Sequence, residues 1–239
     1  MKRTFRLSLV VALFCAALAP VSGKNRSKAP EVKYVFYMIG DGMGVNQVFA
    51  TQLYNEATGY GPSVINFTRF PVRNFITTVS GSSIVTDSAA GGTALASGVK
   101  TYNNAVGMAM DTTAVSLISE WARDSGYGVG IVTSVGVNHA TPASFTAHTS
   151  VRWNYEDIAY QYIANPTDFM AGAGFITHRR TGHTGAYFEN QTQEAGITIF
   201  RGPSEFKGIS SAKGKVLCLS GKQQTDLPYA IDRRADDTT

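Results

Sequence analysis

The chain has 239 residues, of which 44% are apolar and 24 are glycine, and its formal net charge is +4. This is the composition of a globular protein that is long enough for one good core. Without Lys2, Arg3 and Arg6, 18 basic residues stand against 17 acidic ones, so the charge falls to about +1. The sequence shows no basic patch, which argues against nucleic acid as a specific partner.

The first 23 residues have the pattern of a secretory signal. The three basic residues precede an uncharged run over 7–19, and small residues follow it. That run is too short for a membrane span, which needs about 20 apolar residues. We therefore expect cleavage near Ser22 or Gly23, a polar leader over 24–31, and export to the periplasm or the exterior. No transmembrane helix is expected in the mature chain.

The rest of the chain alternates between strand-like and helix-like segments. Residues 32–39 form an apolar run that predicts a buried strand and ends at a glycine turn over 40–44. The later segments predict, in order, a helix over 45–56, a strand over 72–79, a helix from 88 towards 98, a helix over 114–124 capped by 111–113, a strand over 127–133, a helix over 154–164, and strands over 169–173, 197–200 and 216–219. Apolar strands that alternate with helices indicate a mostly parallel sheet covered on both faces. We predict an α/β three-layer sandwich with ligands at the carboxyl ends of its strands.

Ser88 lies in the segment Thr-Asp-Ser-Ala-Ala-Gly-Gly-Thr, at the start of a predicted helix. The N–H groups of a first helical turn lack partners and favour an anion, so a hydroxyl there is well placed to attack a phosphate. Gly91 and Gly92 each cost about 1 kcal/mol in a helix, which indicates close approach of another helix or a ligand. The alternative is an ordinary helix start, with Asp87 or Ser88 as the N-cap.

Four further side chains are candidates for the same site. Asp41 stands between two glycines after the first predicted strand, where it suits a metal ligand or a simple turn. His139 and Thr141 are two residues apart, so an extended segment can direct both to one site, and both types bind metals. Arg152 offers a planar fork for two phosphate oxygens. Individually, the histidine also suits an ordinary loop and the arginine a solvated surface.

Together these segments resemble one family, alkaline phosphatase. The matching text is Gly-Asp-Gly-Met-Gly over 40–44, Thr-Asp-Ser-Ala-Ala over 86–90, and His-Ala-Thr-Pro-Ala over 139–143, followed by Ala-His-Thr over 147–149 and by Arg152. The resemblance runs from about Val32 to the last residue. It implies an exported, metal-dependent enzyme that hydrolyses phosphate monoesters through a phosphoserine intermediate, using two Zn²⁺ and one Mg²⁺.

The resemblance also implies a role for each candidate residue. Asp41 looks like the carboxylate shared by a zinc site and the magnesium site. Ser88 looks like the nucleophile and a zinc ligand, and Arg152 like the phosphate clamp. His139 and Thr141 occupy positions similar to magnesium ligands. Some family members have aspartate in place of His139, and that difference is associated with altered metal preference at the third site.

The chain departs from the family in its second half. The remaining zinc and magnesium ligands belong to a C-terminal half that this sequence does not contain. After Thr149 the histidines are His178 and His183, which lie in a polar stretch that reads as a surface turn. We therefore expect residues 32–239 to be the N-terminal part of a single catalytic domain. We also expect this chain to lack a complete zinc site and to be inactive on its own.

Two alternatives stay open at the level of sequence. One is a secreted, catalytically silent fragment that binds phosphate or metal. The other is a phosphodiesterase or sulfatase sibling of the same superfold, although Ser88 and Arg152 favour monoesters. The expected partners are small phosphate monoesters and inorganic phosphate, together with a second copy of the chain in a full-length homodimer.

Overall fold

The computed structural model describes residues 32–178 and 182–220. The chain divides into two units, Met1–Gly40 and Asp41–Thr239, and each is described by itself. The predicted signal over 1–23 and the leader over 24–31 lie outside the described residues. Within the described ranges, none of the helices combines the length and the hydropathy of a membrane span.

The first unit carries no strand in its described part. Residues 32–40 have neither helix nor strand, and the side chain of Phe36 is 83% exposed. The prediction of a buried strand over 32–39 is therefore wrong for this structure. A strand needs hydrogen-bonded neighbours for its N–H and C=O groups, and the described residues 32–40 form no strand pairing. The predicted strand over 72–79 is absent for the same reason.

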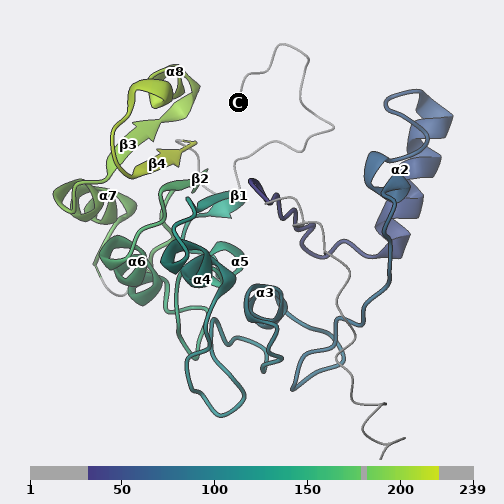
Figure 1. The fold of residues 1–239 in the computed structure, drawn as a ribbon, viewed down its shortest axis with the longest axis horizontal. Coiled ribbons are helices and arrows are strands. Elements are labelled where there is room, and N and C mark those ends of the chain that lie inside the picture. The colour runs from purple at the N-terminus through teal and green to yellow at the C-terminus, as the bar shows by residue number, and fades with distance from the viewer. Residues whose placement is uncertain (1–31, 179–181, 221–239) are drawn as a thin grey trace, which may run out of the picture. The chain divides into compact units, whose positions relative to one another are not determined.

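The second unit is built on a parallel sheet. Its strands are β1 (Gly130–Gly136), β2 (Phe169–Ala173), β3 (Thr198–Arg201) and β4 (Val216–Leu219), in the order β1-β2-β4-β3 (Figure 1). Every neighbouring pair is parallel. The predicted α/β class and the parallel sheet are confirmed.

The α-helices are α2 (Val45–Thr58), α3 (Ser88–Ser97), α4 (Ile118–Asp124), α5 (Ala140–Ala143), α6 (Tyr155–Ala164), α7 (Gly185–Glu194) and α8 (Gly202–Phe206), with short 3₁₀ turns at Asn66–Arg69 and Ile209–Ser211. The helices predicted from position 88 and over 154–164 are confirmed. The helix predicted over 114–124 begins later, because Asp111 bonds to Thr113 in a local turn instead of capping it. The N-cap residue is Leu117, whose N–H donates to the carboxylate of Glu120 in the first turn at 2.9 Å.

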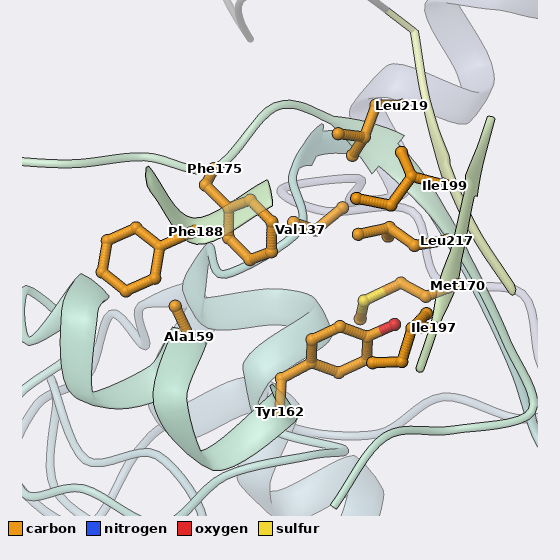
Figure 2. Packing of buried hydrophobic residues seen from close by; sticks show 10 residues of the cluster. All are labelled: Val137, Ala159, Tyr162, Met170, Phe175, Phe188, Ile197, Ile199, Leu217 and Leu219. Carbon is orange, nitrogen blue, oxygen red and sulfur yellow. The ribbon is translucent and has the colours of Figure 1, made fainter. Parts of the chain in front are cut away.

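One face of the sheet packs against α6 and α7. The strand register aligns Ile131, Met170, Leu217 and Ile199 in one row across all four strands. These side chains belong to the main core, whose buried members are Val137, Ala159, Tyr162, Met170, Phe175, Phe188, Ile197, Ile199, Leu217 and Leu219 (Figure 2). Burying each large apolar side chain contributes about 1.5–3 kcal/mol, so this face supplies much of the stability of the unit.

The opposite face of the sheet is covered only in part. Its corresponding row is Val132, Ala171, Cys218 and Phe200. Cys218 is buried, and α8 packs on β3 and β4, but Val132 is 75% exposed. Among the described residues, the predicted second layer of helices therefore covers β3 and β4 but leaves this face of β1 exposed.

A smaller cluster joins α3, α5 and α6 beside the sheet. Its members are Ala89, Val106, Ala140, Ala143, Ala147 and Ile158. These small residues let α3 and α5 approach closely. A Cβ on Gly92 would lie only 2.6 Å from Ser144 Oγ, so glycine is needed there for packing. The sequence signal of close approach at this position therefore reflects a neighbouring helix.

Candidate active site

Asp41 is the point at which three distant segments meet. It opens a tight turn in which Gly42 has a φ of +67°, a conformation that favours glycine. Its Oδ2 accepts one hydrogen bond from Ser88 Oγ at 2.9 Å and a second from Thr141 Oγ1 at 3.0 Å. Those partners lie 47 and 100 positions away in the chain. The structure thus brings three of the five predicted site residues together at one carboxylate oxygen.

Ser88 is the first residue of α3, and the residue before it is the N-cap. Asp87 has extended backbone, and its Oδ1 accepts from the Ala90 N–H at 2.9 Å. The capping alternative is therefore correct for Asp87. Because Asp87 provides the cap, the Ser88 hydroxyl is left to face Asp41.

The second oxygen of Asp87 joins the helix start to Arg152. Oδ2 accepts from the Asn104 N–H at 3.0 Å and from Arg152 Nη1 at 3.0 Å. The backbone of Arg152 is tied to the same loop, since its N–H donates to the Asn104 carbonyl at 2.8 Å. Asn104 has a φ of 79°, which asparagine tolerates better than most residues. This loop therefore fixes Arg152 beside the helix that begins with Ser88.

His139 and Thr141 do not share an extended segment. His139 has extended backbone as the N-cap of α5, while Thr141 lies inside that short helix. The expected geometry is wrong at this point, because a helical turn forms where the sequence suggested alternation. His139 still reaches the site, since its Nε2 accepts from Arg152 Nη2 at 3.1 Å. The five predicted site residues therefore fall into two hydrogen-bonded groups, one around Asp41 and one around Arg152. The groups meet at the start of α3, where Asp87 of the second group directly precedes Ser88 of the first.

Burial and charge both act on His139. Burial lowers the pKa of its imidazole most, the positive charge of Arg152 lowers it further, and the negative charge of Asp41 opposes both. Two polar atoms beside this contact are buried without a hydrogen-bond partner, His139 Nδ1 and Arg152 Nε. Buried polar atoms are normally paired, so both atoms are available to a bound group.

The family model of alkaline phosphatase matches residues 32–171, which contain all five predicted site residues and Asp87. The chain belongs to the alkaline phosphatase family. An alkaline phosphatase of Schizosaccharomyces pombe is 36% identical over 231 residues, which cover 88% of this chain and 42% of that protein. Alkaline phosphatase 4 of Bacillus subtilis is 39% identical over 145 residues, which cover 59% of this chain and 31% of that protein. The chain thus spans less than half the length of these relatives.

Solved alkaline phosphatases share the fold. The enzyme of the Antarctic bacterium TAB5 aligns with a TM-score of 0.66 at 32% identity, covering 82% of this chain and 55% of that one. The cold-active enzyme of a Shewanella species gives a TM-score of 0.66 at 30% identity, covering 82% and 47%. A histidine-to-aspartate variant of the TAB5 enzyme has been solved with Mg bound in its M3 site, with a TM-score of 0.62 at 32% identity, covering 73% and 50%.

Three other histidines of this family member have protein partners. His148 contacts the Gly107 carbonyl through Nδ1 at 2.7 Å and Glu120 through Nε2 at 3.0 Å, which suits a structural role. His178 Nε2 bonds to the Trp153 carbonyl at 2.7 Å. His183 Nδ1 pairs with Glu156 at 3.1 Å. The predicted surface turn between the last two is only partly described, because 179–181 lie outside the described residues.

The sequence did not reveal two features of this candidate site. Asp87 was predicted as a cap, but its bond to Arg152 depends on a contact 65 positions away. No sequence motif indicated that the loop at Asn104 would hold Arg152 and Asp87. A group of three or more His, Cys, Asp or Glu side chains able to hold a metal is also absent from the residues that the structure describes.

Proposed function

We propose that Ser88 is the nucleophile and Arg152 the phosphate clamp of a phosphate monoester hydrolase that works through a phosphoserine intermediate. Membership of the alkaline phosphatase family supports this reaction class. One observation carries the proposal: Asp87 caps the helix that begins with Ser88 and also binds Arg152. The hydroxyl and the guanidinium are therefore held at the same end of one helix.

In the first step Ser88 Oγ attacks phosphorus. The Oγ–P bond forms and the P–O bond to the alcohol breaks. The Ser88 hydroxyl releases its proton to solvent, and the leaving alcohol takes one up from solvent. Serine is a poor nucleophile at its free pKa, so its oxygen needs orientation and activation. Asp41 accepts the hydrogen bond of the hydroxyl at 2.9 Å and so orients the oxygen. In the second step water attacks the phosphoserine, which releases inorganic phosphate and restores Ser88.

Two kinds of donor hold the phosphate oxygens in this proposal. Arg152 offers a planar fork, and its buried Nε has no protein partner. The first turn of α3 offers N–H groups that lack helical partners, apart from Ala90 N–H, which Asp87 takes up. Hydrogen-bond donors that are already oriented stabilise the charge of the transition state without reorganising. The positions of these donors therefore account for much of the proposed rate enhancement.

Asp41, Thr141 and His139 would hold the magnesium ion. A carboxylate and a hydroxyl are oxygen ligands of the kind that Mg²⁺ prefers, whereas imidazole suits zinc or another transition metal better. The unpartnered Nδ1 of His139 and its lowered pKa fit a neutral imidazole that can bind a metal. When bound, the ion would supply positive charge that stabilises negative charge at the site.

The described residues do not fit a complete zinc site. Asp41 and Ser88 are two candidate ligands, whereas zinc sites in proteins use three or four protein ligands. We therefore propose that this chain alone hydrolyses phosphate esters negligibly. The same incomplete donor set favours the second candidate function, a secreted protein that binds phosphate or metal without turnover.

Calorimetry with inorganic phosphate tests the clamp on the chain itself. We expect wild type and S88A to bind phosphate, and R152A to lose that binding. S97A is the matched control, because Ser97 lies at the other end of α3, where its hydroxyl bonds to the Thr93 carbonyl and the Val99 N–H. Unchanged binding by R152A would overturn the clamp assignment.

An activity assay distinguishes a phosphatase from a protein that binds phosphate or metal without turnover. With ZnCl₂ and MgCl₂ present, we expect negligible hydrolysis of p-nitrophenyl phosphate by this chain, and robust turnover would refute the incomplete zinc site. The coding DNA downstream of Thr239 provides the next test. Where the frame continues into further aspartates and histidines, the longer protein should form phosphoserine at Ser88 and prefer monoesters to phosphodiesters and sulfate esters. Its mass in solution tests the proposed homodimer.

We also propose export from the cell. The support is the signal pattern over 1–23, which lies outside the described residues. N-terminal sequencing of protein recovered from the periplasm or the medium should begin near residue 23 or 24. An intact N-terminus on the mature protein would refute cleavage.

A further inference from the structure

Trp153 directly follows Arg152 and lies against its side chain. The guanidinium carbon of Arg152 is 4.9 Å from the centroid of the Trp153 ring, which is a cation–π distance. The indole is 51% exposed, whereas Arg152 is only 8% exposed. The ring is therefore the outer wall of an otherwise buried guanidinium.

Trp153 is itself held from two sides. Its ring meets Tyr155 edge to face, with centroids 6.0 Å apart and an interplanar angle of 84°. Its carbonyl bonds to His178 Nε2 at 2.7 Å, and the His178 ring lies 5.2 Å from that of Tyr155. Tyr155 is buried in the first turn of α6. The indole is thus anchored to a helix, and it can hold a neighbour in place.

We propose that Trp153 is a positioning residue that holds the guanidinium of Arg152 in the orientation used to bind phosphate. This inference rests on the proposed function of Arg152 as the clamp. In this structure the terminal nitrogens of the guanidinium, Nη1 and Nη2, donate hydrogen bonds to Asp87 and His139, and these bonds fix the positions of both nitrogens. A phosphate that takes up these donors competes with both partners. The contact with the ring uses none of the hydrogen-bond donors of the guanidinium, so it persists while their partners exchange.

Phosphate affinity provides the first test. Measured by calorimetry with inorganic phosphate, W153L should bind about two- to fivefold more weakly, and W153F should restore most of the affinity because it keeps an aromatic face. W121L is the matched control, since Trp121 is the other tryptophan and is also exposed. It should bind as wild type does. Equal affinity of W153L and wild type would overturn the proposal.

The second test does not need phosphate. In the W121F background Trp153 is the only indole, so its fluorescence emission should shift when Arg152 is replaced by methionine. In urea unfolding, the midpoint shifts of W153L and R152M should be non-additive, because each substitution removes the same contact. Superimposable spectra together with additive shifts would overturn the positioning role. If wild type binds no phosphate, the clamp and the proposed function fail, whereas this second test still decides whether Trp153 holds Arg152.

Discussion

Asp87 offers a direct measure of how strongly the start of α3 and Arg152 are joined. D87S keeps a good N-cap residue for the Ala90 N–H but removes the carboxylate that binds Arg152. The side chains of Arg152 and Asp87 are only 10% and 21% exposed. Removing one partner of a buried ion pair costs about 3–5 kcal/mol, and partial exposure of Asp87 lowers our expectation to about 2–3 kcal/mol.

D87A also removes the cap, so we expect about 1 kcal/mol of further destabilisation relative to D87S. Urea unfolding followed by far-UV circular dichroism measures both changes. A loss of about 2–3 kcal/mol lowers the midpoint by roughly 1 M or more at typical urea slopes. D111S is the control, because Asp111 is exposed and bonds only to Thr113, and its midpoint should not move. A wild-type midpoint for D87S would refute the reasoning, since the ion pair would then contribute nothing.

Three further outcomes follow from the packing and the site. In the urea assay, G92A should destabilise the protein by about 1–3 kcal/mol, because its Cβ would clash with Ser144. A Cβ at Gly91 would make only ordinary contacts, so G91A should stabilise the protein by up to about 1 kcal/mol. Stability changes of the same sign in the two variants would contradict this. Burial raises the pKa of the Glu120 carboxyl, but its hydrogen bonds outweigh burial and lower that pKa. The ionised carboxylate therefore stabilises the folded state at pH 7, and this contribution is lost as the pH falls through the lowered pKa. The stability difference between wild type and E120Q should therefore begin to narrow as the pH falls below the ordinary glutamate pKa, and it should close only below the lowered pKa; a constant difference would contradict the shift. In calorimetry T141V should bind Mg²⁺ about tenfold more weakly, T141S should restore binding, and equal affinities would refute the assignment.

The sequence predicted local structure best where the information is itself local. The strands at 169–173 and 216–219 match the structure residue for residue, because short apolar runs with flanking turns specify them. The run over 32–39 has the same local pattern but forms no strand. Pairing requires a neighbour, and the composition of a segment does not say whether one is available.

The site residues could be named from motifs, but their connections could not. Asp41, Ser88 and Thr141 each stood in a recognisable segment, and the structure joins them at one oxygen. The second function of Asp87 was not visible, because an N-cap uses one carboxylate oxygen and the partner of the other depends on the tertiary fold. Trp153 gave no signal beyond its place after Arg152, since a ring packed on a guanidinium follows from side-chain conformations.

The position of Asp41 has a consequence for ligand affinity. From 41 to 88 no residue is buried, so the segment that carries Asp41 adds no buried side chain to the core of its unit. Two hydrogen bonds link its carboxylate to Ser88 and Thr141. Segments with so few buried contacts open locally, without global unfolding. A ligand that requires Asp41 therefore binds only the fraction of molecules in which this segment is closed, and its apparent affinity is reduced by that fraction. Any contact that buries part of this segment would tighten ligand binding without touching the ligand.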